Sequence, residues 1–115
     1  MGYNLHPMFR EGFQLYNQAY EAKEEAYQVV TMWTPIDEKR RALWEGMAVL
    51  VSAKRGISEL MVKVENVTDL TPFDKDQCIL GLDGRLDNID TWVAEVEAYN
   101  PRIDMMEQLN VRCLS

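Results

Sequence analysis

The side chains in this chain that could carry chemistry are mainly carboxylates, and five of them recur every seven residues. This acidic series is Asp69, Asp76, Asp83, Asp90 and Glu97. On a helix, an interval of seven returns to the same face after two turns. With Asp87 between Asp83 and Asp90, three carboxylates share one face and could do general acid–base work. Because the sequence gives no sign of a cleft around them, we interpret them as a surface for solvent or for a partner.

The remaining polar residues offer little to an enzyme or a metal site. His6 is the only histidine, so a zinc site or a di-iron bundle has almost no ligands. Because His6 precedes an expected helix start, we expect a solvated boundary residue rather than a general base. Asp74-Lys75-Asp76 resembles the start of a calcium loop, but Ile79 and Arg85 stand where that loop needs Gly and Glu. We predict a non-enzymatic protein with no cofactor and no metal.

The length and net charge of the chain narrow further the classes of protein to which it could belong. The chain has 115 residues and a net charge of −7, which predicts a single domain over residues 1–115 and argues against direct nucleic-acid binding. The longest apolar run, Met47 to Val51, is too short for a membrane span. Charged residues throughout the first thirty positions leave no signal peptide visible. Cys78 and Cys113 are then expected to be reduced thiols of a cytoplasmic protein, in the host cytoplasm if the protein is viral.

Prolines mark where helices begin. Thr34-Pro35-Ile36-Asp37 and Thr71-Pro72-Phe73-Asp74 share one pattern, with Thr as N-cap, Pro in the first turn and Asp at the positive end of the helix dipole. Asn100-Pro101 repeats it with Asn as the cap, and His6-Pro7 is a weaker version. The helices predicted from these marks span residues 7–33, 35–66, 72–99 and 101–112.

Each long helix carries an apolar stripe at helical spacing. The second has Ile36, Leu43, Leu50, Ile57 and Val64; the third has Ile79, Leu82, Leu86, Ile89, Val93 and Val96; the first has Phe9, Phe13, Tyr16, Tyr20, Tyr27 and Val30. We therefore predict an all-α, antiparallel bundle of three long helices plus a short C-terminal helix, with coiled-coil-like packing. Gly56, Gly81 and Gly84 fall inside these stripes, and we expect continuous helices with close approach of a neighbour there. A break at Gly84 is the alternative.

Most of the chain's net negative charge lies in the segment that holds the acidic series. Residues 67–100 hold eight acidic and two basic side chains, net −6, whereas residues 34–66 have a net charge of +1. With Ile79 at position a, Asp76, Asp83, Asp90 and Glu97 fall at position e, beside the core. They either pair with Arg40, Lys54 or Lys63 of the second helix, or form an exposed surface for a basic partner.

The aromatic stripe of the first helix has three interpretations. It could stack bases, but that helix has few cations. Packing in the core, with the hydroxyl groups at the edge, fits better. Tyr16, Tyr20 and Tyr27 could also contact a partner. Trp33 and Trp44 are expected to clamp the first helix–helix connection.

From these features we expect a small helical protein that acts by protein–protein contact, as an assembly, structural or accessory subunit, and that self-associates. The alternative is an acidic inhibitor that occupies the nucleic-acid-binding surface of a partner enzyme. The predicted partner-binding residues are Asp76, Asp83, Asp87, Asp90, Glu97, Tyr16, Tyr20 and Tyr27.

Overall fold

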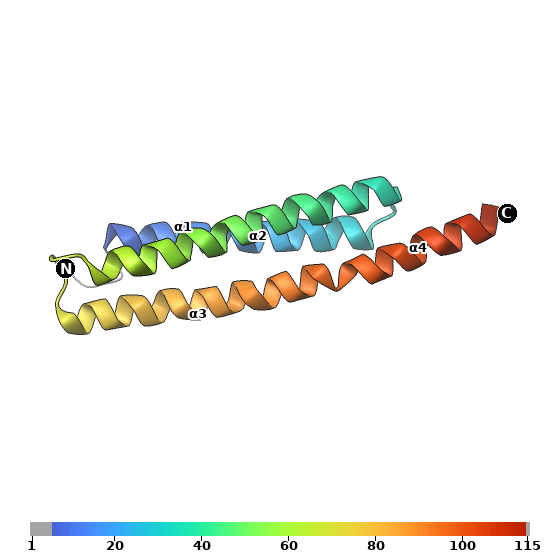
Figure 1. The fold of residues 1–115 in the computed structure, drawn as a ribbon. Coiled ribbons are helices and arrows are strands. Elements are labelled where there is room, and N and C mark those ends of the chain that lie inside the picture. The colour runs from blue at the N-terminus through green and yellow to red at the C-terminus, as the bar shows by residue number, and fades with distance from the viewer. Residues whose placement is uncertain (1–5, 115) are drawn as a thin grey trace.

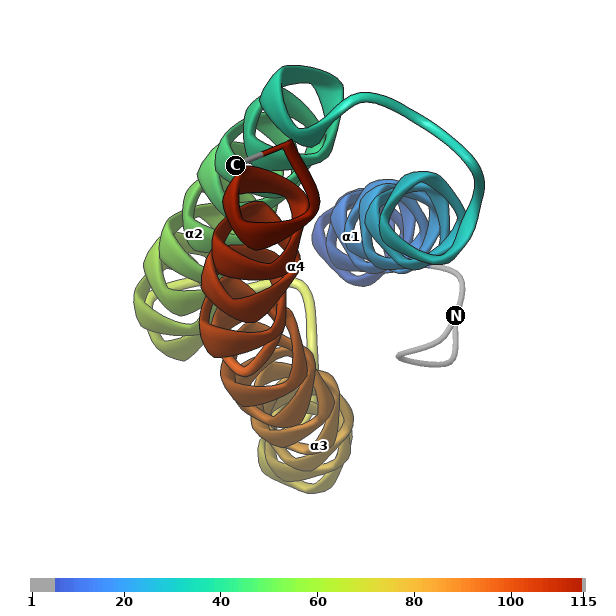
Figure 2. The same cartoon turned by 90° about the vertical axis from the view of Figure 1, so that its right-hand side faces the viewer.

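The computed structural model describes residues 6–114, and the side chains of residues 6–109, as an all-α bundle. The helices are α1 (Pro7–Thr31), α2 (Ile36–Glu65), α3 (Pro72–Glu97) and α4 (Tyr99–Leu114). They form a rod whose Cα atoms extend over 67 × 16 × 15 Å. Seen along the rod, α1, α2 and the α3–α4 pair occupy three corners (Figure 2). The predicted fold class is confirmed.

The last two helices form one nearly continuous arm. The sequence predicted a start at Pro101 with Asn100 as cap, but α4 begins at Tyr99, and only Ala98 separates it from α3. Pro101 lies in the first turn of α4, where its missing N–H leaves no hydrogen bond unmade. The arm keeps its direction through this junction, and its end projects past the α1–α2 connection (Figure 1). The fourth helix therefore extends the third.

Two other helices begin at their proline marks, α1 at Pro7 and α3 at Pro72, whereas α2 begins at Ile36 with Pro35 as its N-cap. Thr71 caps α3 as predicted, because its Oγ1 accepts from the backbone N–H of Asp74 at 3.1 Å. Thr34 was predicted to cap α2 in the same way. Instead its hydroxyl donates to the carbonyl oxygen of Val29 at 2.8 Å, so it satisfies the end of α1 rather than the start of α2.

The core of α2 matches the predicted series. Leu43, Leu50, Ile57 and Val64 are buried, and Ile36 is partly buried. The core of α3 is rotated by about one position: Leu82, Ile89, Val96 and, on α4, Ile103 are fully buried. Ile79, Leu86 and Val93 only flank this row. With Leu82 at position a, the acidic series falls at position b, further from the core than predicted.

Small residues, and not the aromatic stripe, fill the centre of α1. Gly12, Ala19 and Ala26 recur at intervals of seven and are buried, whereas Phe13, Tyr20 and Tyr27 are 45–48% exposed. A Cβ added to Gly46 of α2 would lie 3.3 Å from Cβ of Ala26. These small side chains let α1 and α2 pack closely, and the aromatic residues lie beside that contact.

The helices are continuous through all three glycines, as predicted, but the predicted close approach of a neighbour occurs only at Gly56 and Gly81 and is wrong at Gly84. An added Cβ on Gly56 would lie 2.7 Å from Cδ1 of Leu15, and one on Gly81 would lie 2.8 Å from the ring of Phe9. Nothing lies within 4 Å of such a Cβ on Gly84, and α3 is continuous through that position.

Candidate partner-binding surface

The acidic series is partly paired and partly free. Asp90 forms an ion pair with Lys54 at 2.5 Å, as one of the two interpretations predicted. Asp69 accepts from Nε2 of His6 at 3.1 Å. Asp76, Asp83 and Glu97, like Asp87, are exposed and form no ion pair with another described residue.

Arg40 pairs with α4 rather than with the acidic series itself. Its guanidinium donates to Asp104 at 2.9 Å and also to Glu107. Asp104 is seven residues beyond Glu97, so it continues the series onto α4. The hydrogen bonds to the two carboxylates raise the pKa of Arg40, which therefore stays charged.

Apolar residues alternate with the acids on the outer surface of α3. One exposed row follows a strict three–four spacing: Phe73, Asp76, Leu80, Asp83, Asp87, Asp90, Ala94 and Glu97. This spacing keeps the row in line along the helix, as in a coiled-coil contact. Phe73 and Leu80 are more than 60% exposed. The α3 row therefore combines negative charge with large apolar side chains in water.

The outer surface of α2 has a row of the same spacing with the opposite charge. Its members are Arg41, Trp44, Ala48, Val51, Arg55, Ser58 and Val62. All are exposed except Ser58, which is half-buried. Arg41 and Arg55 are the charged members, and neither pairs with another described residue. The α2 row therefore combines positive charge with Trp44, Val51 and Val62.

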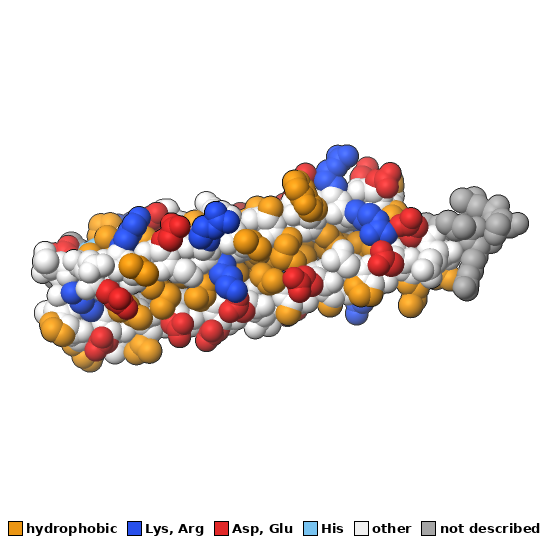
Figure 3. Space-filling view, viewed as in Figure 1, with side chains coloured by type: hydrophobic (Ala, Val, Ile, Leu, Met, Phe, Trp, Pro, Cys, Tyr) orange, Lys and Arg blue, Asp and Glu red, His pale blue; other side chains and the backbone are white. Residues whose placement is uncertain are grey.

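The two rows lie on the same side of the rod. Asp90 of the α3 row contacts Lys54, and Lys54 is a surface neighbour of Val51 and Ser58 because residues three and four apart adjoin on a helix. Figure 3 shows this side, with hydrophobic side chains between the helices, most of the Lys and Arg side chains over α2, and a line of carboxylates over α3. We call the two rows together the α2–α3 face.

The tyrosines lie on a different side, between α1 and α3. The ring centroids of Tyr16 and Tyr20 lie 5.0 and 5.7 Å from that of Trp92, and Tyr27 lies 6.3 Å from Tyr99. Asn88 donates to the hydroxyl of Tyr16 at 3.1 Å. The structure thus brings the predicted tyrosines together at a helix contact, separate from the acids.

A cation is stacked into this aromatic group. The guanidinium carbon of Arg85 lies 4.9 Å from the ring centroid of Phe9 and 5.3 Å from that of Phe13, and its Nη1 donates to the carbonyl oxygen of Gly81 at 3.0 Å. Arg85 Nε is buried without a hydrogen bond to a described residue. Cation–π contacts with several rings compensate part of that loss.

Two sequence predictions about boundary residues are wrong. His6 is buried and not solvated: its Nδ1 accepts from the N–H of Met8 at 3.2 Å, so Nε2 carries the proton that Asp69 accepts. Trp33 and Trp44 do not clamp the α1–α2 connection, because Trp33 is fully exposed and Trp44 is 75% exposed.

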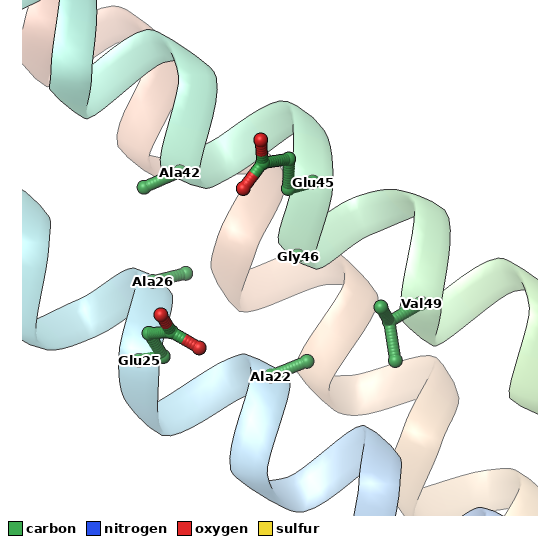
Figure 4. Close-up of a pocket in the computed structure, with 7 residues that line it drawn as sticks. All are labelled: Ala22, Glu25, Ala26, Ala42, Glu45, Gly46 and Val49. Carbon is green, nitrogen blue, oxygen red and sulfur yellow. The ribbon is translucent and has the colours of Figure 1, made fainter.

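Concave surfaces are shallow and poor in catalytic groups. A groove of about 170 Å³ between α1 and α2 is floored by small residues, with Glu25 from α1 and Glu45 from α2 beside it (Figure 4). A larger groove of about 460 Å³ lies at the end of the rod, between Trp33 and Met106. Lys39 lines that groove, but its ammonium group is already bonded to backbone carbonyls.

Burial shifts the pKa of two further groups without creating a reactive site. It raises the pKa of the Cys78 thiol, which disfavours the nucleophilic thiolate. Burial, followed by the charge of Glu95, raises the pKa of Tyr99. Cys113 lies outside the residues whose side chains are described, so its predicted reduced state is untested.

The sequence reasoning did not recognise the α2 row. Its spacing is visible in the sequence, but the core series of the same helix repeats at the same interval and gives the stronger apolar signal. The exposed Phe73 and Leu80 were missed for the same reason on α3.

No described helix is both long and apolar enough to cross a membrane, and no group of three His, Cys, Asp or Glu side chains in that part of the chain could hold a metal ion. Comparison with protein-family models, with curated proteins and with solved structures gives no match.

Proposed function

We propose that this chain is a non-enzymatic assembly or accessory subunit that works by binding protein through the α2–α3 face. The observation that carries this proposal is the pair of exposed three–four rows, one apolar and basic, the other apolar and acidic. Exposed large apolar side chains that recur along two neighbouring helices are typical of a protein interface. Charges that border it supply orientation and faster encounter.

The test uses two exposed valines on opposite sides of α2. Val51 belongs to the α2–α3 face and is 43% exposed; Val49 lines the α1–α2 groove and is 39% exposed. We expect V51K to lose the proteins that wild-type chain captures from its native cell extract, and V49K to keep them. Equal capture by both variants would show that the face is not the binding surface.

A second function is supported by the unpaired carboxylates. Asp76, Asp83, Asp87 and Glu97 are free to meet a basic surface, so the chain could inhibit an enzyme by occupying its nucleic-acid-binding site. The apolar side chains interleaved with them favour the assembly role, since a mimic of the phosphate backbone needs charge rather than Phe73 or Leu80.

Competition separates the two functions. If the chain is an inhibitor, duplex DNA displaces it from its partner, and D83K/D87K abolishes binding while E11K/E21K, which alters exposed acids on α1, does not. If it is an assembly subunit, DNA leaves the complex intact. Circular dichroism checks that every variant keeps its helix content.

A further inference from the structure

We propose that a second copy of this chain covers the α2–α3 face, with the α2 row of each copy on the α3 row of the other. This inference rests on the proposed function, because it names the partner of the same face. The first reason is charge: Arg41 and Arg55 have no ion pair with a described residue, and neither do Asp83 and Asp87. One chain therefore carries both halves of a complementary contact.

The shape of the rod restricts where a second copy can bind. With Cα extents of 67 × 16 × 15 Å, one side offers on the order of 1,000 Å², whereas a stable interface takes ~800 Å² from each partner. An end of the rod offers about a quarter of one side, too little for such an interface. The groove at the rod's end is therefore excluded as the main contact, and a whole side must be used.

Charge also chooses between the two twofold arrangements that lay this face on itself. If the axis runs across the rod, α2 meets the partner's α2 and α3 meets the partner's α3. Two rows of carboxylates then face each other, and their like charges repel. If the axis runs along the rod, each α2 meets the partner's α3, and Arg55 of the α2 row faces the partner's acidic row. Only the second arrangement is complementary.

The level of a residue, meaning its position along the rod, agrees with this arrangement. Lys54 lies opposite Asp90 and Arg40 lies opposite Asp104, equally far along both helices. An axis along the rod leaves these levels unchanged. Arg55 then meets the partner's Asp87 and the partner's Asp90.

Two apolar members of the α2 row, Val51 and Val62, match apolar members of the α3 row at the same levels. Counting from the two ion pairs, Val51 meets the partner's Ala94, and Val62 lies between the partner's Leu80 and the partner's Asp83. Each apolar member of the α2 row named here thus finds an apolar member of the α3 row. By symmetry, every such contact occurs twice in the dimer.

Charge reversal with rescue tests the arrangement. Sedimentation equilibrium on the purified chain should give a dimer, and R55E or D87K alone should raise its Kd roughly tenfold or more. The double variant R55E/D87K restores opposite charges at both symmetric contacts, so its Kd should return close to that of the wild type. R10E and E21K, on exposed positions of α1, make the same charge changes away from the face and should leave the Kd unaltered.

Each other outcome overturns the inference. A wild-type chain that stays monomeric at high micromolar concentration rules out a second copy, while the proposed function keeps its own test with V51K in extract. A dimer that R55E and R10E weaken equally uses another surface. A dimer that both single variants weaken, without rescue in the double variant, does not pair α2 with the partner's α3. Added salt provides an independent measurement, since it should weaken the wild-type dimer.

Discussion

The ammonium group of Lys39 lies 2.7 Å from the carbonyl oxygen of Val30, so a buried side chain of α2 closes the end of α1. The same group donates to the carbonyl oxygens of Val29 and Met32 at 3.2 and 2.5 Å. All three ammonium protons therefore have acceptors, and the positive charge lies at the negative end of the α1 dipole. The Lys39 side chain therefore ties the start of α2 to the end of α1.

Removing that ammonium group should be costly. We expect K39M to lower the free energy of unfolding by about 2 kcal/mol, because the buried carbonyl oxygen of Val30 loses its donor while the aliphatic part of the side chain is kept. Urea denaturation followed by circular dichroism measures it. K63M, at an exposed position in the last turn of α2, is the control and should change stability by less than about 0.5 kcal/mol. Equal effects of the two variants would contradict this role.

Two glycine-to-alanine variants should act in opposite directions. At Gly84 the added methyl group meets nothing within 4 Å, and helix propensity should stabilise the protein by about 0.5–1 kcal/mol. At Gly46 the methyl group would lie 3.3 Å from Cβ of Ala26 and 3.4 Å from the carbonyl oxygen of Ala22. Neither atom can rotate away, so α1 and α2 must separate slightly. Thermal unfolding should show G84A above wild type and G46A below wild type.

Stability should fall in alkaline solution, partly through Cys78. Burial raises the pKa of this thiol in the folded chain, so the unfolded chain loses its thiol proton first as pH rises. The stabilising contribution is complete below the ordinary thiol pKa of about 8.5 and is lost as pH rises through the folded value. Urea titrations at neutral and alkaline pH should show a smaller decrease for C78A than for wild type. Parallel decreases would argue against a buried, protonated thiol.

The three tryptophans should contribute very differently to stability. Trp92 packs against Tyr16 and Tyr20 between α1 and α3, so W92A should lose about 3–5 kcal/mol. W33S and W44S remove exposed rings and should stay within about 0.5 kcal/mol of wild type. Denaturant unfolding of the three variants gives the comparison. A large loss in W33S would mean that the ring has a structural contact.

The sequence predicted the helices well because their signals are local. Thr71 and Pro72 suffice to start α3, and the Leu43, Leu50, Ile57 series suffices to orient α2. The rotation of α3 could not be predicted, because it depends on α1. Small residues such as Ala19 and Ala26 bring α1 close to α2, and Trp92 then turns inward against the rings of α1. The row of α3 that is buried therefore depends on the sizes of side chains where separate helices meet, and not on the hydrophobicity of α3 alone.

The candidate site was predicted only in part, because some of its contacts depend on how separate helices meet. The charge and spacing of Asp83 and Asp87 indicated an exposed acidic surface, and both are exposed. The pairing of Asp90 with Lys54 requires the level at which α2 and α3 meet, which no single helix encodes. The tyrosines and the acids were both predicted to bind a partner, but the fold places them on separate sides of the rod.

The chain runs along the rod an odd number of times, through α1, back through α2 and out again through the α3–α4 arm. The start of α1 and the end of α4 lie at opposite ends of the bundle (Figure 1), whereas a chain that crosses an even number of times returns to its origin. Polypeptides joined at these two points would be held apart by a stiff strut of about the rod's length, 67 Å. The rod thus sets the distance between the start of α1 and the end of α4.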